Sequence, residues 1–214
     1  SSKLQEPYSA SIGRGYIPDG LTSSDTSSLK PSITGSSIVS PNKAVLSDTN
    51  QQPVFDVSKQ EIVFRRTTLI VRNIETSLML YKDALGMKVV YDNILTSRDG
   101  SKSRLIFLKT KDEHVGILGL WELDYGSPSS DRRNLPVERK AFVPQGNIHL
   151  FNTNNLDKKW KRVIEVPGVE VYREPTYREY PSYDGSDVIK VNVSIIYDPD
   201  GNMIELNQLL TPIK

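Results

Sequence analysis

The stretch that decides the fold is Asp198-Pro199-Asp200-Gly201-Asn202-Met203-Ile204-Glu205-Leu206, near the C-terminus. Asp-Pro-Asp-Gly is typical of a tight turn, because Pro fixes φ at one turn position and Gly accepts a positive φ at another. Residues 191–197 before the turn and residues 203–206 after it are rich in strand-forming side chains. The segment therefore predicts a β-hairpin. Glu205 is a carboxylate in an otherwise apolar strand, and a buried carboxylate needs a cation, a metal or hydrogen bonds.

Composition excludes several classes of function. The chain has 214 residues and a net charge of +1, so it has room for one large domain or two small ones and carries no basic stripe for nucleic acid. No apolar run is long enough for a transmembrane segment. Cysteine is absent, which excludes disulfides, thiolate catalysis and zinc–sulfur sites.

Residues 1–60 differ from the rest of the chain, since they are rich in Ser, Thr, Pro and Gly and contain no Phe, Trp or Met before Phe55. Such a low-complexity segment has too little apolar surface to offset its ordering entropy and predicts an extended N-terminal tail. The tail is either a tether or the contact region for a protein partner. Together with the absence of cysteine and a chain that begins at Ser1, it favours an exported protein, periplasmic, extracellular or lipoprotein-anchored, over a cytoplasmic one.

The folded part is expected over residues 62–210, and its first module over residues 62–123. A strand at 64–71 precedes Asn73, which suits a helix N-cap. The following helix has an apolar face at i, i+4, i+7 and i+11, made of Ile74, Leu78, Tyr81 and Leu85. Strands at 87–91, 104–108 and 115–123 complete a β-α-β-β-β order.

The same order recurs in a second module, over residues 146–210. A strand at 147–152 leads to a helix with the apolar face Leu156, Trp160, Val163 and Ile164, and strands at 169–172, 191–197 and 203–206 follow. Ile74 and Leu156 are 82 residues apart, as are Leu78 and Trp160. A constant offset between matching helices indicates an internal repeat, with residues 124–146 as its connector.

Two tandem β-α-β-β-β modules that end on residues 198–206 resemble the vicinal oxygen chelate superfamily, which includes glyoxalase I, extradiol dioxygenases, and fosfomycin and bleomycin resistance proteins. Residues 72–86 of the first helix and the closing segment carry the resemblance, which covers about residues 62–210. It implies an α+β fold in which two curved sheets face each other around a cavity. It also implies a divalent metal, held by side chains from the first and last strands of each module.

The resemblance places the four metal-ligand positions on Arg66, on Gly119 or Leu120, on Ile148 and on Glu205. Arg has no lone pair for a metal, Ile and Gly cannot bind one, and a catalytic metal generally needs about three protein ligands. His149 would reach the site only after a one-residue shift of strand register, so we interpret it as a half-buried strand residue. The metal-free interpretation is favoured; if a metal such as Fe, Mn, Ni or Zn is bound, Glu205 and His149 are its candidate ligands.

Five residues are the candidates for ligand binding in the cavity: Arg66, Thr68, Glu205, Tyr177 and Tyr180. Arg66 and Thr68 share one face of the first strand, and an ion pair between Arg66 and Glu205 is expected to replace the metal. The tyrosines belong to a region rich in Tyr and Arg, which binding surfaces favour. We therefore expect a binding or accessory protein for a small molecule or a protein partner. The alternative is a metal-dependent glyoxalase-type lyase or dioxygenase.

Overall fold

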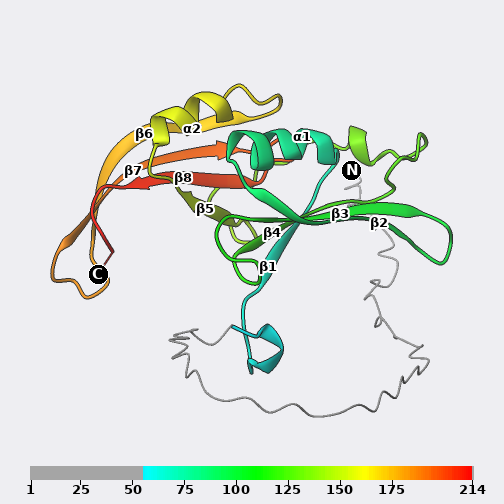
Figure 1. Cartoon of the computed structure of the whole chain (residues 1–214). Helices are drawn as coiled ribbons and strands as arrows, with labels where there is room; N and C mark the ends of the chain where they lie inside the picture. The colour runs from blue at the N-terminus through cyan, green and yellow to red at the C-terminus, as the bar shows by residue number, and fades with distance from the viewer. Residues whose placement is uncertain (1–54, 214) are drawn as a thin grey trace, which may run out of the picture. The chain divides into compact units, whose positions relative to one another are not determined.

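The computed structural model describes residues 55–213, and the expectations for the tail before residue 55 lie outside this range. Two four-stranded mixed sheets form the framework of the described chain (Figure 1). No helix within residues 55–213 has both the length and the apolar character needed to cross a membrane.

The first module consists of one sheet, called sheet A, and one helical segment. Its elements are β1 (Arg66–Ile70), α1 (Ile74–Leu78), the π-helical turn η2 (Met79–Ala84), β2 (Lys88–Thr96), β3 (Lys102–Lys109) and β4 (Ile117–Glu122). The strand order is β1-β4-β3-β2, and β1 runs parallel to β4 while the other pairs are antiparallel. The α1–η2 segment connects β1 to β2, which are the two edge strands of the sheet.

The second module repeats this arrangement in sheet B. Its elements are β5 (Ile148–Asn152), α2 (Leu156–Val163), β6 (Glu170–Pro181), β7 (Val188–Tyr197) and β8 (Met203–Leu209). The order β5-β8-β7-β6, with β5 parallel to β8, matches that of sheet A. The predicted α+β fold of two tandem β-α-β-β-β modules is confirmed. Short 3-10 turns, η1 (Val57–Lys59) and η3 (Arg132–Asn134), lie outside the sheets.

Both helices begin in the same way, which strengthens the evidence for a repeat. Asn73 and Asn155 are the N-caps, and their side chains accept backbone hydrogen bonds from the first turn. A side chain from the last strand of each module accepts the N–H of the first helical residue. Glu122 accepts from the Ile74 nitrogen at 2.8 Å, and Gln208 accepts from the Leu156 nitrogen at 2.9 Å.

The first helix differs from the uniform α-helix that the apolar spacing predicts. After α1 the chain widens into η2, where the Leu85 nitrogen donates to the Leu80 carbonyl. A π turn adds one residue to a helical turn and so rotates the residues that follow it. As a result Leu80 and Tyr81 are both fully buried, whereas Leu85, predicted on the apolar face, is only half-buried.

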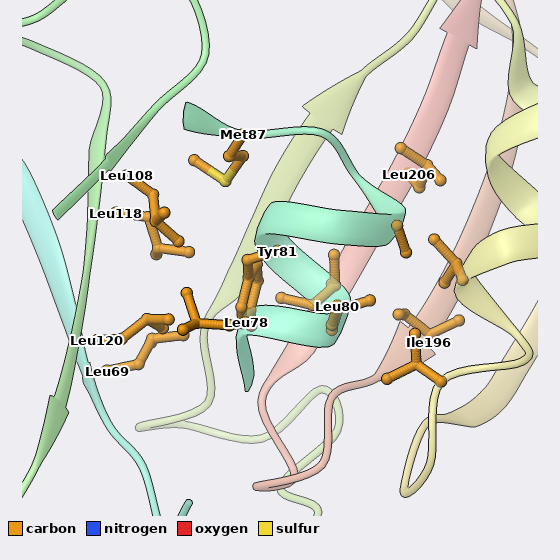
Figure 2. Close-up of a cluster of buried hydrophobic side chains, with 14 of the residues drawn as sticks. Leu69, Leu78, Leu80, Tyr81, Met87, Leu108, Leu118, Leu120, Ile196 and Leu206 are labelled. Carbon is orange, nitrogen blue, oxygen red and sulfur yellow. The ribbon is translucent and has the colours of Figure 1, made fainter. Parts of the chain in front are cut away.

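The main hydrophobic core joins the two modules. In Figure 2 the α1–η2 segment lies between leucines of sheet A, such as Leu69 and Leu120, and Ile196 and Leu206 of sheet B. Trp160 of α2 belongs to the same cluster. Leu78 is 9% exposed and Trp160 is 7% exposed, which confirms that they lie on buried helix faces.

The turn at residues 198–201 has the predicted hairpin geometry and also links the modules. The Gly201 nitrogen donates to the Asp198 carbonyl, and Gly201 has a φ of 90°. The fully buried Asp198 carboxylate accepts from the Asp200 and Asn202 nitrogens, from the Asn202 side chain, and from the Tyr81 hydroxyl at 2.6 Å. Asp200 pairs with Arg72 at 2.7 Å, so two carboxylates of this turn contact the first module.

Candidate functional site

Strand register fixes which positions of the two modules are equivalent. In sheet A Thr68 is paired with Gly119, and in sheet B Leu150 is paired with Glu205. Gly119 is therefore the counterpart of Glu205. A Cβ atom at Gly119 would lie 2.6 Å from the Thr68 hydroxyl oxygen, so this position has no room for a metal-binding side chain.

Arg66 lies on the face of sheet A that points away from the helix, together with Thr68 and Ile70. Its guanidinium carbon lies 3.9 Å from the centre of the Phe107 ring, and its Nε donates to the Thr68 hydroxyl at 3.0 Å. The Phe107 ring stacks on Tyr91 at 4.6 Å. Burial, followed by the nearby charge of Arg65, lowers the pKa of the Arg66 guanidinium. Within residues 55–213 no carboxylate forms an ion pair with Arg66.

Glu205 lies on the equivalent face of sheet B, between Leu150 of β5 and Ile195 of β7. Its carboxylate accepts a hydrogen bond of 2.7 Å from the Asn207 side chain. Asn207 is 6% exposed, and its own oxygen Oδ1 has no hydrogen-bond partner. The expected ion pair between Arg66 and Glu205 is not formed, because each residue is held by neighbours in its own sheet.

His149 lies on the opposite face of sheet B from Glu205. Its register partner is Ile204, one residue before Glu205, and successive strand residues point to opposite faces. Its Nδ1 is buried without a partner, and burial lowers the pKa of its imidazole. His149 and Glu205 are therefore not positioned to share a metal. The other histidine, His114, is exposed in the turn before β4.

The two candidate tyrosines lie on edge strand β6, and they point to different faces. Tyr177 is paired with Asn192, whereas Tyr180 is paired with Ile189. Ile189 shares the face of Ile195 and Glu205, so Tyr180 lies on the Glu205 face and Tyr177 on the other. The Tyr177 hydroxyl donates to Glu179. Sheet B thus brings only one of these tyrosines to the side of Glu205.

The side chains at the four positions do not suit a divalent metal. Arg66 is a cation, Gly119 has no side chain, Ile148 is apolar, and Glu205 alone offers oxygen ligands. Within residues 55–213 no group of three or more His, Cys, Asp or Glu side chains gathers in the way a metal site requires. The donor set differs from the one that the resemblance implies.

Sequence reasoning missed the two aromatic residues beside Arg66. Both strands were predicted, but β2 and β3 change register between Val89 and Tyr91. This bulge places Tyr91 opposite Phe107, and nothing in the local sequence pattern fixes that pairing.

The sequence matches a known protein family over most of its length. Residues 63–206 match the model of the Glyoxalase/Bleomycin resistance protein/Dioxygenase superfamily. A glyoxalase family protein from Bacillus cereus has a similar structure, with 14% identity, a TM-score of 0.50, and coverage of 73% of this chain and 100% of that one. The trypanothione-dependent glyoxalase I of Leishmania major has 21% identity, a TM-score of 0.46, and coverage of 68% and 85%.

At 14% identity the Bacillus cereus structure supports the fold alone. No curated protein sequence matches the chain. The family match spans both modules and includes the closing hairpin. The chain belongs to the Glyoxalase/Bleomycin resistance protein/Dioxygenase superfamily.

Proposed function

We propose that this chain is a binding member of its superfamily that takes a small carboxylate at Arg66 and works without a metal. The observation that supports the proposal is the position and the pairing of the Arg66 guanidinium. It stands at a strand position that the resemblance assigns to a metal ligand, and it has no carboxylate partner within residues 55–213.

The contacts of Arg66 leave its binding edge free. Among contacts within residues 55–213 only Nε donates, to Thr68, and the flat face of the group rests on Phe107. Both Nη groups remain for a ligand, and the planar fork of Arg matches the two oxygens of a carboxylate. Stacking on an aromatic ring restricts the side chain before binding, which reduces the entropy lost on complex formation.

The surroundings of Arg66 favour a ligand with an apolar body. Ile70 on the same strand face is 53% exposed, and Phe107 and Tyr91 are half-buried. Apolar walls with a few polar groups are the usual make-up of small-molecule sites. Benzoate combines the two features and serves as the first probe.

Substitution of Arg66 tests the proposal directly. Titration followed by amide chemical shifts is expected to show saturable benzoate binding, about tenfold weaker or more in Arg66→Met, because a hydrogen bond to a charged group is lost. Arg65→Met removes the same charge from the adjacent exposed residue and should leave the affinity unchanged. Absence of saturable binding, or equal weakening by both changes, would contradict the proposal.

Metal analysis addresses the second candidate function, a metal-dependent lyase or dioxygenase. Family membership and the Glu205 carboxylate favour this candidate. Stoichiometric Fe, Mn, Ni or Zn retained after dialysis, and lost in Glu205→Gln, would support it and overturn metal-free binding. The metal-free proposal requires that dialysed protein retains none of these metals and still binds benzoate.

A further inference from the structure

Helix α2 presents a dense group of cations far along the chain from Arg66. Four of its eight residues are basic: Lys158, Lys159, Lys161 and Arg162. Its apolar residues Leu156, Trp160 and Val163 are buried, so the four basic residues and Asp157 occupy the remaining surface of the helix.

The cations of α2 outnumber the one carboxylate of the helix, Asp157. Lys158 and Arg162 are four residues apart and therefore neighbours on the helix, where like charges destabilise it. None of the four basic side chains forms an ion pair with any residue in the described range 55–213. A cluster with this excess of positive charge attracts an anion.

Three of these cations surround a cavity. Its volume is about 240 Å³, and it is lined by Thr153, Asn154, Asn155, Lys158, Lys159 and Arg162. No carboxylate and no apolar side chain is among these residues. The volume is below the roughly 300–1,000 Å³ of pockets for drug-sized ligands, so the cavity suits a small anion.

Lys159 is held at the rim of this cavity rather than free in solvent. Its Nζ donates to the Leu85 carbonyl at 2.7 Å, which ties the side chain to the end of η2. Burial, followed by the charges of Arg162 and Lys158, lowers the pKa of Lys159. The shift has the sign expected when cations crowd together without an anion between them.

A second, more apolar cavity of about 200 Å³ shares Thr153 and Lys159 with the first. Its other lining residues include Leu85, Met87, Phe151 and Leu206. A ligand that places its anion among the cations can therefore direct a small apolar group past Lys159 into this second cavity.

We propose that the cavity beside α2 binds the phosphate group of a small phosphate monoester through Lys158, Lys159 and Arg162. A phosphate dianion offers three strong acceptor oxygens to three cations, and Arg and Lys are the residues that bind it best. The apolar cavity receives the ester group. This site is separate from Arg66 and does not depend on the function proposed there.

Phenyl phosphate is the probe, and the matched control lies on the same helix. Phosphorus and amide NMR titration of the full chain is expected to show saturable binding, about tenfold weaker or more in Lys158→Gln and in Lys159→Gln. Lys161→Gln removes one charge from α2 without touching the cavity and should retain the wild-type affinity. Lys158 is exposed, so its substitution keeps the test informative even if Lys159→Gln unfolds the protein.

A second readout follows from charge. Bound phosphate stabilises the ammonium form, so the pKa of Lys159, measured by NMR of its side chain, should rise when phenyl phosphate is added. Phenol lacks the phosphate and should leave it unchanged. Three results would overturn the proposal: no saturable binding, equal weakening in Lys161→Gln, or binding of phosphatidic acid vesicles but not of phenyl phosphate.

Discussion

Asp198 shows how one residue serves both the local turn and the contact between modules. Its carboxylate accepts four hydrogen bonds, three from within the turn and one from Tyr81 of the first module. Both Asp198 and Tyr81 are fully buried. A buried carboxylate is tolerated only when its lone pairs are satisfied, so the hydroxyl of Tyr81 matters more than its position on an apolar helix face indicates.

Tyr81→Phe tests this role at the level of one atom. Removal of the hydroxyl leaves one Asp198 oxygen short of a donor without emptying the ring site, and the expected loss of unfolding free energy is about 1–3 kcal/mol. Urea denaturation measures it. Tyr183→Phe, at a side chain that is 81% exposed, should change stability by less than about 0.5 kcal/mol. An equal effect of both changes would show that the hydrogen bond contributes nothing.

The same tyrosine predicts how stability depends on pH in the alkaline range. Burial, followed by the charge of Asp198, raises the pKa of Tyr81 well above its usual value of 10.0. The unfolded chain therefore loses this proton first as pH rises, so the stability contributed by Tyr81 is full below about pH 10 and falls above it. Tyr81→Phe should show a smaller loss of stability above pH 10 than the wild type.

At the level of elements, the strongly patterned segments could be predicted and the irregular ones could not. Asn73 and the turn at residues 198–201 marked element ends correctly, because cap and turn chemistry is local. The π turn η2 was missed because apolar spacing assumes a regular helix. β6 was predicted only to residue 172 but extends to Pro181, since an edge strand tolerates Pro175 and Pro181.

Helix α2 should depend on Trp160 for its attachment to the core. Trp160→Ala removes a large side chain from the shared core, and the expected loss is about 3–5 kcal/mol. Ile164→Ala is the control, because Ile164 follows the same helix but is 42% exposed. Thermal or urea unfolding should show a much smaller loss there. Comparable losses would mean that Trp160 is not an anchor of the core.

At the level of the whole molecule, the sequence predicted which strand positions make up the candidate site, but it did not predict which of their side chains contact each other. Gly119 and Glu205 are 86 residues apart, but the 82-residue offset correctly relates β1 to β5, where Thr68 and Leu150 are equivalent. It carries no information on how the sheets meet. The arrangement of the two sheets follows from packing around the α1–η2 segment. In this arrangement Arg66 contacts the Phe107 ring, and Glu205 accepts a hydrogen bond from Asn207.

A core that draws residues from both modules predicts that they unfold together. The chain has two tryptophans, Trp121 in β4 and Trp160 in α2, so each module carries its own fluorescent probe. Trp121→Phe leaves only the probe of the second module, and Trp160→Phe leaves only that of the first. Within each variant the urea midpoint from fluorescence should coincide with that from far-ultraviolet circular dichroism, as a two-state transition requires.

Because Asp198 and Asp200 also fix the closing hairpin to Tyr81 and Arg72, a module that lost its partner would expose the apolar side of its sheet and two buried carboxylates. Midpoints that separate in either variant would show instead that each module is stable alone.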